Sequence, residues 1–217
     1  MNTIGWKKTV ISVEDYLDKL FPNPKCELEY NKDYELLIAV VLSAQTTDKQ
    51  VNKVTKILFD KYKTLKELSN ADINDIEEII KPIGTYSKKA LFIKEISNYL
   101  LNECDGKVPN DREKLLKIKG VGRKTINVVL SNLFNENCLA VDTHVTRVSK
   151  RLGIAKEKDD VLTIEQKLGK YYKYINLGKR HHQMVLFGRY KCKAKNPICI
   201  DCMLKDICKE HKKNSTI

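Results

Sequence analysis

Apolar residues recur at helical spacing along almost the whole chain, between residues that favour helix starts and stops. The clearest case is Tyr34 to Ala44, which is apolar on every side around Leu36 to Leu42 and predicts a buried helix capped by Asp33. Hairpin turn signals do not occur. Only Cys138 to Val145 is rich enough in β-branched residues to be interpreted as a strand instead. The pattern therefore predicts an all-α protein.

Further helix boundaries follow from side chains that can accept a hydrogen bond from the first helical turn. The candidate starts are Ser12, Asp48, Thr64 with Glu67, Asp72, Ser87, Asp111, Asp142, and Thr163 with Gln166. We expect helices over 73–80, 123–134 and 178–190, and Gly153 to stop the helix after Asp142. Two apolar stripes are expected to face the core: Val51, Val54, Ile57 and Leu58, and Ala90, Leu91, Ile93, Ile96, Leu100 and Leu101.

Composition narrows the class of partner. The 217 residues carry a formal net charge of +12, which favours a polyanion such as nucleic acid over a neutral ligand. The longest apolar run, Leu36 to Leu42, is far shorter than the ~20 residues of a membrane helix. The N-terminus has no apolar secretory segment, so we expect a cytoplasmic protein that does not bind a membrane.

Two glycines interrupt the helical pattern in Lys119-Gly120-Val121-Gly122-Arg123-Lys124-Thr125. Glycines one residue apart allow a tight turn and a close approach of the backbone to a ligand. The following helix start offers N–H groups and a positive dipole end, and Arg123 and Lys124 add charge there. This predicts a phosphate clamp that does not depend on base sequence. The alternative is an ordinary turn between helices, with glycine at a helix C-terminus.

The cysteines Cys192, Cys199, Cys202 and Cys208 fall within 17 residues. In a chain without a secretory signal, such a group predicts a metal site rather than disulfides. Four thiolates suit either zinc or an iron–sulfur cluster, although zinc sites usually use two separated Cys-x2-Cys pairs. The first loop of the group carries Lys193 and Lys195, which we expect to contact phosphates.

Three motifs occur in order before the cysteines: Leu42-Ser43-Ala44-Gln45-Thr46-Thr47-Asp48, the hairpin Gly120 to Thr125, and Val141-Asp142-Thr143-His144-Val145. With the cysteine spacing, they resemble the endonuclease III family of helix-hairpin-helix DNA glycosylases over roughly residues 30–208. The resemblance implies two helical domains: a six-helix domain at 26–136 with the hairpin, and residues 1–25 plus 137–217 with a C-terminal iron–sulfur loop. It also implies a [4Fe–4S] cluster on the four cysteines, and a monomer that acts on duplex DNA with damaged or abasic nucleotides.

The activity that the resemblance implies is that of a bifunctional DNA N-glycosylase and AP lyase. Such an enzyme removes oxidised pyrimidines and cleaves 3′ to the abasic site by β-elimination. Lys124 matches the amine that attacks C1′, and a lysine amine is a nucleophile only when neutral. Asp142 matches the carboxylate that the family places beside the lysine, where it can accept a proton or stabilise a cationic sugar. Helix capping alone is the alternative role for Asp142.

The remaining expected DNA contacts are Gln45, Thr85, Lys119, Gly120, Val121, Gly122, Arg123, Lys193 and Lys195. By resemblance, Gln45 and the turn with Thr85 fill the space left by an extruded nucleotide. Many relatives have a bulky apolar residue where Thr85 stands, and usually a proline where Lys119 stands. Lys119 relaxes the entry to the turn and adds a charge that we expect to face phosphates.

Three other functions compete with this interpretation. A monofunctional mismatch glycosylase of the same superfamily would lack the lysine at Lys124 and have a glutamate where Ala39 stands. A non-catalytic DNA-binding module would use the hairpin and the cysteines only as a scaffold. A zinc-stabilised DNA binder would use the same four cysteines for a different metal.

Overall fold

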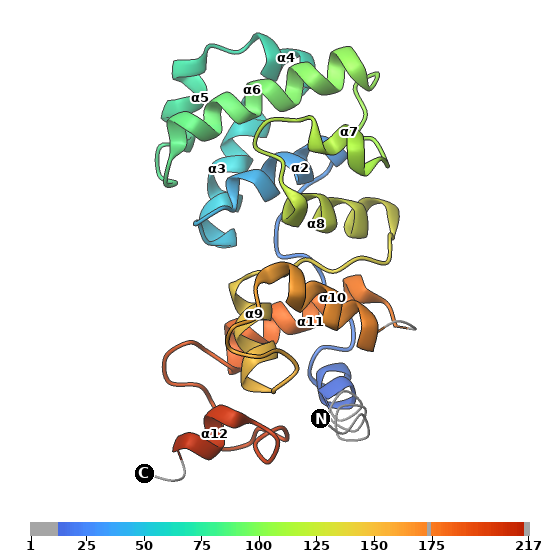
Figure 1. The fold of residues 1–217 in the computed structure, drawn as a ribbon. Helices are drawn as coiled ribbons and strands as arrows, with labels where there is room; N and C mark the ends of the chain where they lie inside the picture. The colour runs from blue at the N-terminus through green and yellow to red at the C-terminus, as the bar shows by residue number, and fades with distance from the viewer. Residues whose placement is uncertain (1–12, 173–174, 215–217) are drawn as a thin grey trace. The chain divides into compact units, whose positions relative to one another are not determined.

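The computed structural model describes residues 13–172 and 175–214, and in these ranges all regular structure is helical (Figure 1). The prediction of an all-α protein is confirmed, and Cys138 to Val145 forms no strand. The chain divides into two compact units, Cys26–Asn135 and a second unit made of the residues before Cys26 and those from Glu136 onward. None of the helices in the described ranges is both long and apolar enough to cross a membrane.

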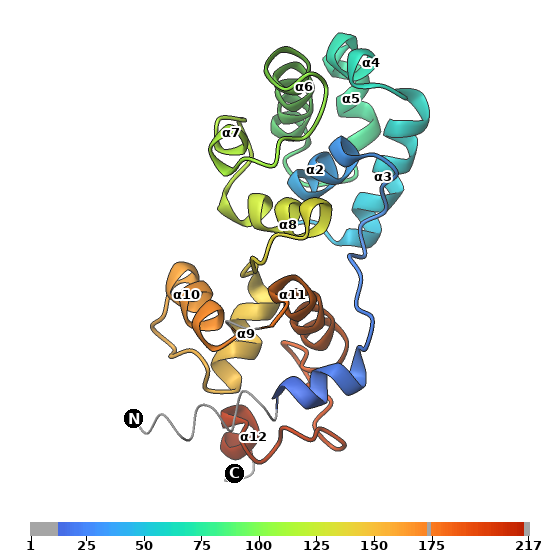
Figure 2. The same cartoon turned by 90° about the vertical axis from the view of Figure 1, so that its right-hand side faces the viewer.

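Helix α2 (Asp33–Leu42) forms the centre of the unit Cys26–Asn135 (Figure 2). Leu36 to Leu42 are all buried, as predicted from their uniformly apolar sequence, and Tyr34 and Glu35 before them are buried as well; the helix ends at Leu42, so Ala44 lies outside it and is exposed. The helix packs against three others: α3 (Asp48–Lys61), α6 (Tyr86–Glu103) and α8 (Arg123–Phe134). Because helices pack on several of its sides, α2 has no side that faces solvent from Leu36 to Leu42.

The shorter helices complete this unit. Helix α6 packs on α4 (Leu65–Asn70) and α5 (Ile73–Ile80), and α7 (Arg112–Leu116) packs on α8. The predicted caps are confirmed at three of these helix starts: Thr64 accepts from the Glu67 N–H, Asp72 from the Asn74 N–H, and Asp111 from two N–H groups of α7. Local hydrogen bonds thus fix where the chain enters each short helix.

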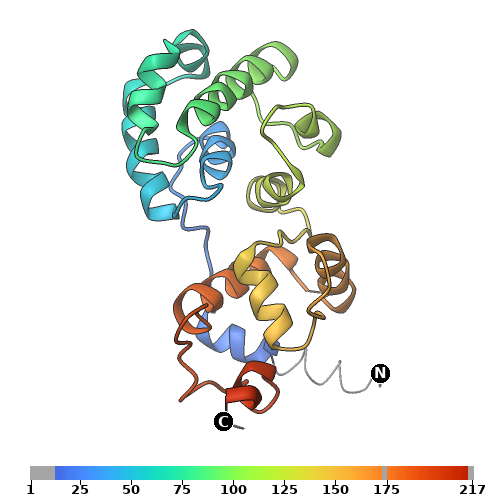
Figure 3. The same ribbon diagram turned by 60° about the vertical axis from the view of Figure 1, so that its left-hand side comes forward.

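The second unit is built around a single apolar core. Its helices are α9 (Thr143–Arg151), α10 (Val161–Tyr171), α11 (Leu177–Leu186) and α12 (Lys209–Asn214), with a π-helical turn η1 (Phe187–Lys191) that continues α11. Helix α9 packs on α10, α11 and η1 (Figure 3). The predicted helix at 178–190 is therefore present, with a wider last turn.

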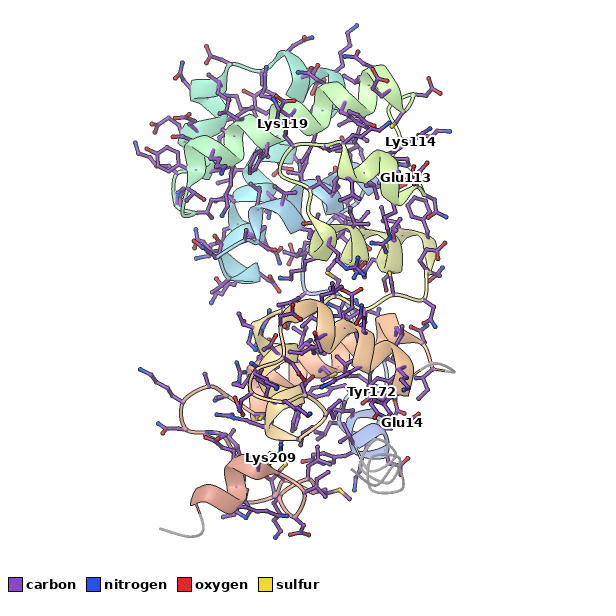
Figure 4. The ribbon with its side chains drawn as sticks, in the orientation of Figure 1. Glu14, Glu113, Lys114, Lys119, Tyr172 and Lys209 are labelled. Atoms are coloured by element: carbon purple, nitrogen blue, oxygen red, sulfur yellow. The ribbon has the colours of Figure 1, made fainter. Side chains whose placement is uncertain are left out.

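A helical segment at residues 13–20 joins this core through Val13, Tyr16 and Leu17. Arg180 of α11 is only 1% exposed and holds the segment by ion pairs to Glu14 (3.5 Å) and Asp18 (3.6 Å). Its guanidinium also lies 5.3 Å from the ring centre of Tyr172; Figure 4 labels Glu14 and Tyr172. The predicted cap of this segment, Ser12, lies outside the described residues.

Two predicted caps are wrong because a nearby carboxylate forms a better one. Asp33 is the first residue of α2, and the Glu35 carboxylate accepts instead from the N–H groups of Asn31 (2.7 Å) and Lys32 (3.2 Å). Thr163 lies inside α10, where its N–H donates to Asp160 Oδ1 at 2.8 Å. At α10 the two candidate acceptors are the Asp160 carboxylate and the Thr163 hydroxyl, and a carboxylate is the stronger acceptor, so Asp160 determines the start.

The start predicted at Ser87 is also off by one residue, because α6 begins at Tyr86 after Thr85.

Two residues of the predicted apolar stripes, Ile57 and Leu91, are 57% and 56% exposed. At 100° per residue, Ile57 lies roughly 120° around the helix from Val51. The Ile57 side chain therefore faces away from the core that Val51 contacts.

Candidate functional site

The glycine hairpin joins α7 to α8 within the unit Cys26–Asn135. Gly120 has a φ of +87°, a left-handed conformation that favours glycine, and the Val121 N–H donates to Ile118 O at 3.1 Å. Gly122 is the N-cap of α8 and contributes no side-chain cap. The first N–H groups of an α-helix have no acceptor inside the helix, so this exposed start suits an external anion.

The side chains of the hairpin differ in what they offer a ligand. The Val121 side chain is buried, so only its backbone can reach a phosphate. Lys119 is exposed and forms a salt bridge to Glu95 of α6 at 3.0 Å (Figure 4). An exposed pair of this kind contributes little to stability. The Lys119 ammonium group can therefore exchange Glu95 for a phosphate at small cost.

Lys124 is the second residue of α8 and is exposed. The first turn of α8 contains no acidic residue, which is also true of α6, α9, α10 and α11, but α8 has two basic residues there. Two basic side chains, Arg123 and Lys124, at the positive end of a helix destabilise it by about 0.3–1 kcal/mol each. A bound anion would reverse that effect, so the charge distribution of α8 suits anion binding better than stability.

Asp142 caps α9 in the second unit. Its Oδ1 accepts from the Val145 N–H at 2.7 Å, and its carbonyl accepts from the Thr146 N–H at 2.9 Å. The predicted capping role is therefore confirmed, and the carboxylate is held in one orientation while remaining partly exposed. The second carboxylate oxygen of Asp142 can accept a proton or a further hydrogen bond.

Gln45 and Thr85 occupy similar turns of the unit Cys26–Asn135. Both are exposed, and both have a φ of +56°, which is unusual for residues with a side chain. Gln45 follows α2, and Thr85 is the N-cap of α6. Strained backbone of this kind persists only when surrounding contacts hold it, and it concentrates at functional sites.

The four cysteines line one pocket in the second unit. Its apolar walls come from Leu152, Phe187, Ile198 and Leu204, and Cys192, Cys202 and Cys208 pack against the core. In the described ranges, no three side chains of His, Cys, Asp or Glu are grouped as the ligands of a single metal ion. The donor chemistry, four thiols at the edge of an apolar core, fits a thiolate-bound metal group.

Two arginines of α9 hold the first loop of the cysteine group. Arg147 Nε donates to Cys192 O at 3.1 Å, and Arg151 donates to Lys193 O (2.7 Å), Ala194 O (3.2 Å) and Cys192 Sγ (3.4 Å). Burial raises the pKa of the Cys192 thiol, and the Arg151 hydrogen bond opposes that rise. Lys193 and Lys195, the predicted phosphate contacts, are exposed on this loop.

Sequence reasoning missed three side chains that organise these elements: Lys89, Arg147 and Arg151. The Arg147 and Arg151 contacts join residues more than 40 positions apart, and no local pattern predicts them. The sequence does contain a signal for the burial of Lys89, because its spacing puts it on the same side of α6 as the buried Ile93 and Ile96. A lysine within an apolar stripe needs hydrogen-bond acceptors in the core.

Comparison with known proteins identifies the class. Residues 38–173 match the family described as HhH-GPD superfamily base excision DNA repair protein. The chain is 45% identical to endonuclease III of Bacillus subtilis (strain 168) over 204 residues, which cover 93% of each chain. It is 42% identical to endonuclease III of Haemophilus influenzae over 192 residues, 88% of this chain and 90% of that one.

Solved structures agree. A non-covalent endonuclease III–DNA complex superimposes with a TM-score of 0.94 at 45% identity, covering 100% of both chains. A trapped endonuclease III–DNA covalent intermediate matches with a TM-score of 0.93 at 46% identity, covering 99% of this chain and 100% of that one.

The hairpin, the helical units and these matches define a helix-hairpin-helix base excision repair protein. Within this superfamily the chain belongs to the endonuclease III family. It is a DNA glycosylase and AP lyase of base excision repair.

Proposed function

We propose that this chain removes oxidised or fragmented pyrimidines from duplex DNA, and that Lys124 is its nucleophile. The observation that carries the proposal is the exposed Lys124 amine in the first turn of α8, directly after the Gly120-Val121-Gly122 hairpin. In that position, the backbone of the hairpin binds the phosphates of the damaged strand while the amine reaches a sugar. The endonuclease III whose covalent DNA intermediate was trapped supports an enzyme that bonds to its substrate.

The proposed reaction begins when the neutral Lys124 amine attacks C1′ of the extruded nucleotide. The N–C1′ bond forms, the glycosidic bond breaks, and the base leaves with a proton. The C1′–O4′ bond then opens to give a Schiff base, and O4′ takes a proton. Loss of a C2′ proton expels the 3′ phosphate from C3′. Hydrolysis of the Schiff base finally releases Lys124 and the unsaturated sugar.

Asp142 is the proposed acid–base or electrostatic partner. Because its Oδ1 accepts a hydrogen bond from the Val145 N–H, the carboxylate is held in one orientation while its other oxygen is available. A carboxylate so fixed can accept a proton in the reaction or stabilise the positive charge that develops on the sugar. Capping and catalysis are compatible for this residue.

Gln45, Thr85 and the basic residues are the proposed DNA contacts. The exposed turns at Gln45 and Thr85 fill the duplex where the damaged nucleotide leaves the stack. The hairpin backbone from Gly120 to Gly122, with Lys119 and Arg123, binds phosphates. Lys193 and Lys195, exposed on the cysteine loop, add further phosphate contacts.

The four cysteines are the proposed ligands of a [4Fe–4S] cluster. Bound there, the cluster would supply the cross-links that fold residues 192–208, a segment that is largely without regular structure. Leu152, Phe187 and Leu204 shield the thiols from water on one side. Arg151, which donates to Cys192 Sγ, would offset part of the negative charge of a Cys192 thiolate that held the cluster.

The test is borohydride trapping on a duplex with one abasic site. The unaltered chain is expected to form a covalent complex, and Lys124→Gln is expected to form none while its DNA affinity stays within about threefold. Lys66→Gln, which removes an exposed lysine of α4, serves as the matched control and should trap normally. Absence of trapping by the unaltered chain would leave a DNA-binding protein without lyase activity. Trapping by Lys124→Gln would assign the nucleophile elsewhere.

A further inference from the structure

Lys89 is a buried lysine in the unit Cys26–Asn135. Its side chain is in α6 and is only 3% exposed, and burial lowers the pKa of its amine. Lysine is almost never fully buried unless hydrogen-bond acceptors replace its water. The Lys89 Nζ has two such acceptors, Ala44 O at 2.7 Å and the Thr46 hydroxyl at 3.1 Å. The cost of burying this amine indicates a specific role for the contacts it makes.

The two acceptors are the residues on either side of Gln45. Gln45 itself is exposed and held at a φ of +56°, between Ala44 and Thr46. The backbone bonds from Ala44 N to Val41 O (3.4 Å) and from Thr46 N to Ser43 O (3.1 Å) close the turn only locally. The Lys89 amine is therefore the contact that ties both sides of the Gln45 turn to another helix.

The backbone of Lys89 makes a second connection. Its N–H donates to Thr85 O at 3.1 Å, which is the ordinary main-chain bond of the first turn of α6 and places the Lys89 side chain one turn after Thr85. Thr85 is the exposed N-cap of that helix and has a φ of +56°, while its hydroxyl bonds only to the adjacent Gly84 O at 2.7 Å. One residue is thus hydrogen-bonded both to the turn that presents Thr85 and to the turn that presents Gln45.

We propose that Lys89 is a positioning residue: from the first turn of the helix that Thr85 caps, its amine holds the Gln45 turn in one arrangement relative to the Thr85 turn, ready to enter a duplex as a nucleotide leaves the stack. This rests on the proposed function, in which the two turns fill the duplex. Unstacking a paired base has a free-energy cost, and a wedge that is already ordered does not add its own ordering entropy to that cost. The role predicts an effect on extrusion and none on bond making at the sugar.

The test compares Lys89→Met with Lys94→Met. Methionine keeps the apolar stem and removes the donors. Lys94 is the matched control because its amine, on the same helix, also has two hydrogen-bond acceptors, Ser69 O and Ala71 O, and contacts neither turn. Both variants are assayed under single-turnover conditions on 5-hydroxyuracil, once paired in a duplex and once in a one-nucleotide bulge, where extrusion is easier.

Lys89→Met is expected to slow excision from the paired duplex about tenfold or more and excision from the bulge much less. Lys94→Met should show no such difference between the two substrates. Fluorescence of 2-aminopurine beside the lesion reports extrusion without any chemistry and should rise less with Lys89→Met. Equal losses on both substrates together with an unchanged fluorescence response would overturn the positioning role.

Two further outcomes are distinguished. If the unaltered chain excises nothing, the proposed function fails, and the fluorescence comparison still decides the role of Lys89. If Lys89→Met does not fold, Thr46→Val removes one acceptor of the amine and keeps the shape of the side chain. Thr46→Val should also slow excision more from the paired duplex than from the bulge, by a smaller factor than Lys89→Met. Equal rates of loss on the two substrates would count against the proposal.

Discussion

Gly120 lies against the ring of Phe92, so that a Cβ placed on Gly120 would come within 2.5 Å of the Phe92 Cγ. The glycine also has a φ of +87°, which a residue with a side chain adopts only under strain. We therefore predict that Gly120→Ala lowers the free energy of unfolding by about 2 kcal/mol or more. Urea denaturation followed by circular dichroism measures this change.

The matched variant is Gly84→Ala. Gly84 has an ordinary φ, and nothing lies within 4 Å of the position that its Cβ would take. Its stability should stay within about 0.5 kcal/mol of the unaltered chain. Equal losses for the two variants would show that the contact between Gly120 and Phe92 does not determine the geometry of the hairpin.

The cysteine group supports a second prediction. Cys208→Ser should yield a protein with less bound iron, weaker broad absorbance near about 400 nm and a lower melting temperature. Cys104→Ser, outside the pocket, is the control and should keep its colour. A colourless unaltered protein that binds zinc would contradict the cluster assignment.

Arg151 is predicted to hold the cluster loop closed. Hydrogen bonds from a charged donor contribute about 1.5–3 kcal/mol each, so Arg151→Met should speed the release of bound metal to a chelator about tenfold or more. The control is Arg112→Met. Arg112 is in the unit Cys26–Asn135, where its Nη2 donates to Asn127 Oδ1, so this variant should leave the release rate unchanged. An unaltered rate in Arg151→Met would mean that α9 does not retain the loop.

The salt dependence of DNA binding tests whether contacts with phosphates supply most of the affinity. With a net charge of +12, binding to undamaged duplex should weaken steeply as salt rises. Replacing both Lys193 and Lys195 by glutamine should reduce the slope of log K against log salt by roughly 1–2. Replacing the exposed Lys56 and Lys66 in the same way should not change it. A flat salt response of the unaltered chain would exclude phosphate contacts as the main source of affinity.

The elements predicted well from the sequence are those fixed by neighbours a few residues apart. Helix α8 has its predicted bounds, Arg123–Phe134, because Gly122 and an apolar stripe define it locally. The cap at Asp142 was predicted for the same reason, since donor and acceptor are three residues apart. The predicted cap at Thr163 was wrong because Asp160 and Thr163 are both possible acceptors and the sequence alone did not rank them.

Contacts between distant residues were beyond such reasoning. The spacing of the cysteines predicted a metal group, but the arginines that hold Cys192 are on α9, 41 and 45 positions earlier. Lys89 was not among the residues that the sequence predicted to have a role. Only the fold shows that its amine is buried against the turn around Gln45.

The central claim is that the Lys124 amine bonds to deoxyribose. The most direct measurement is to reduce the complex of the chain with an abasic duplex by borohydride, digest the protein and DNA, and locate the sugar remnant by mass spectrometry. We predict that the adduct is on the peptide containing Lys124. An adduct on another amine, such as that of Lys119, would contradict the account.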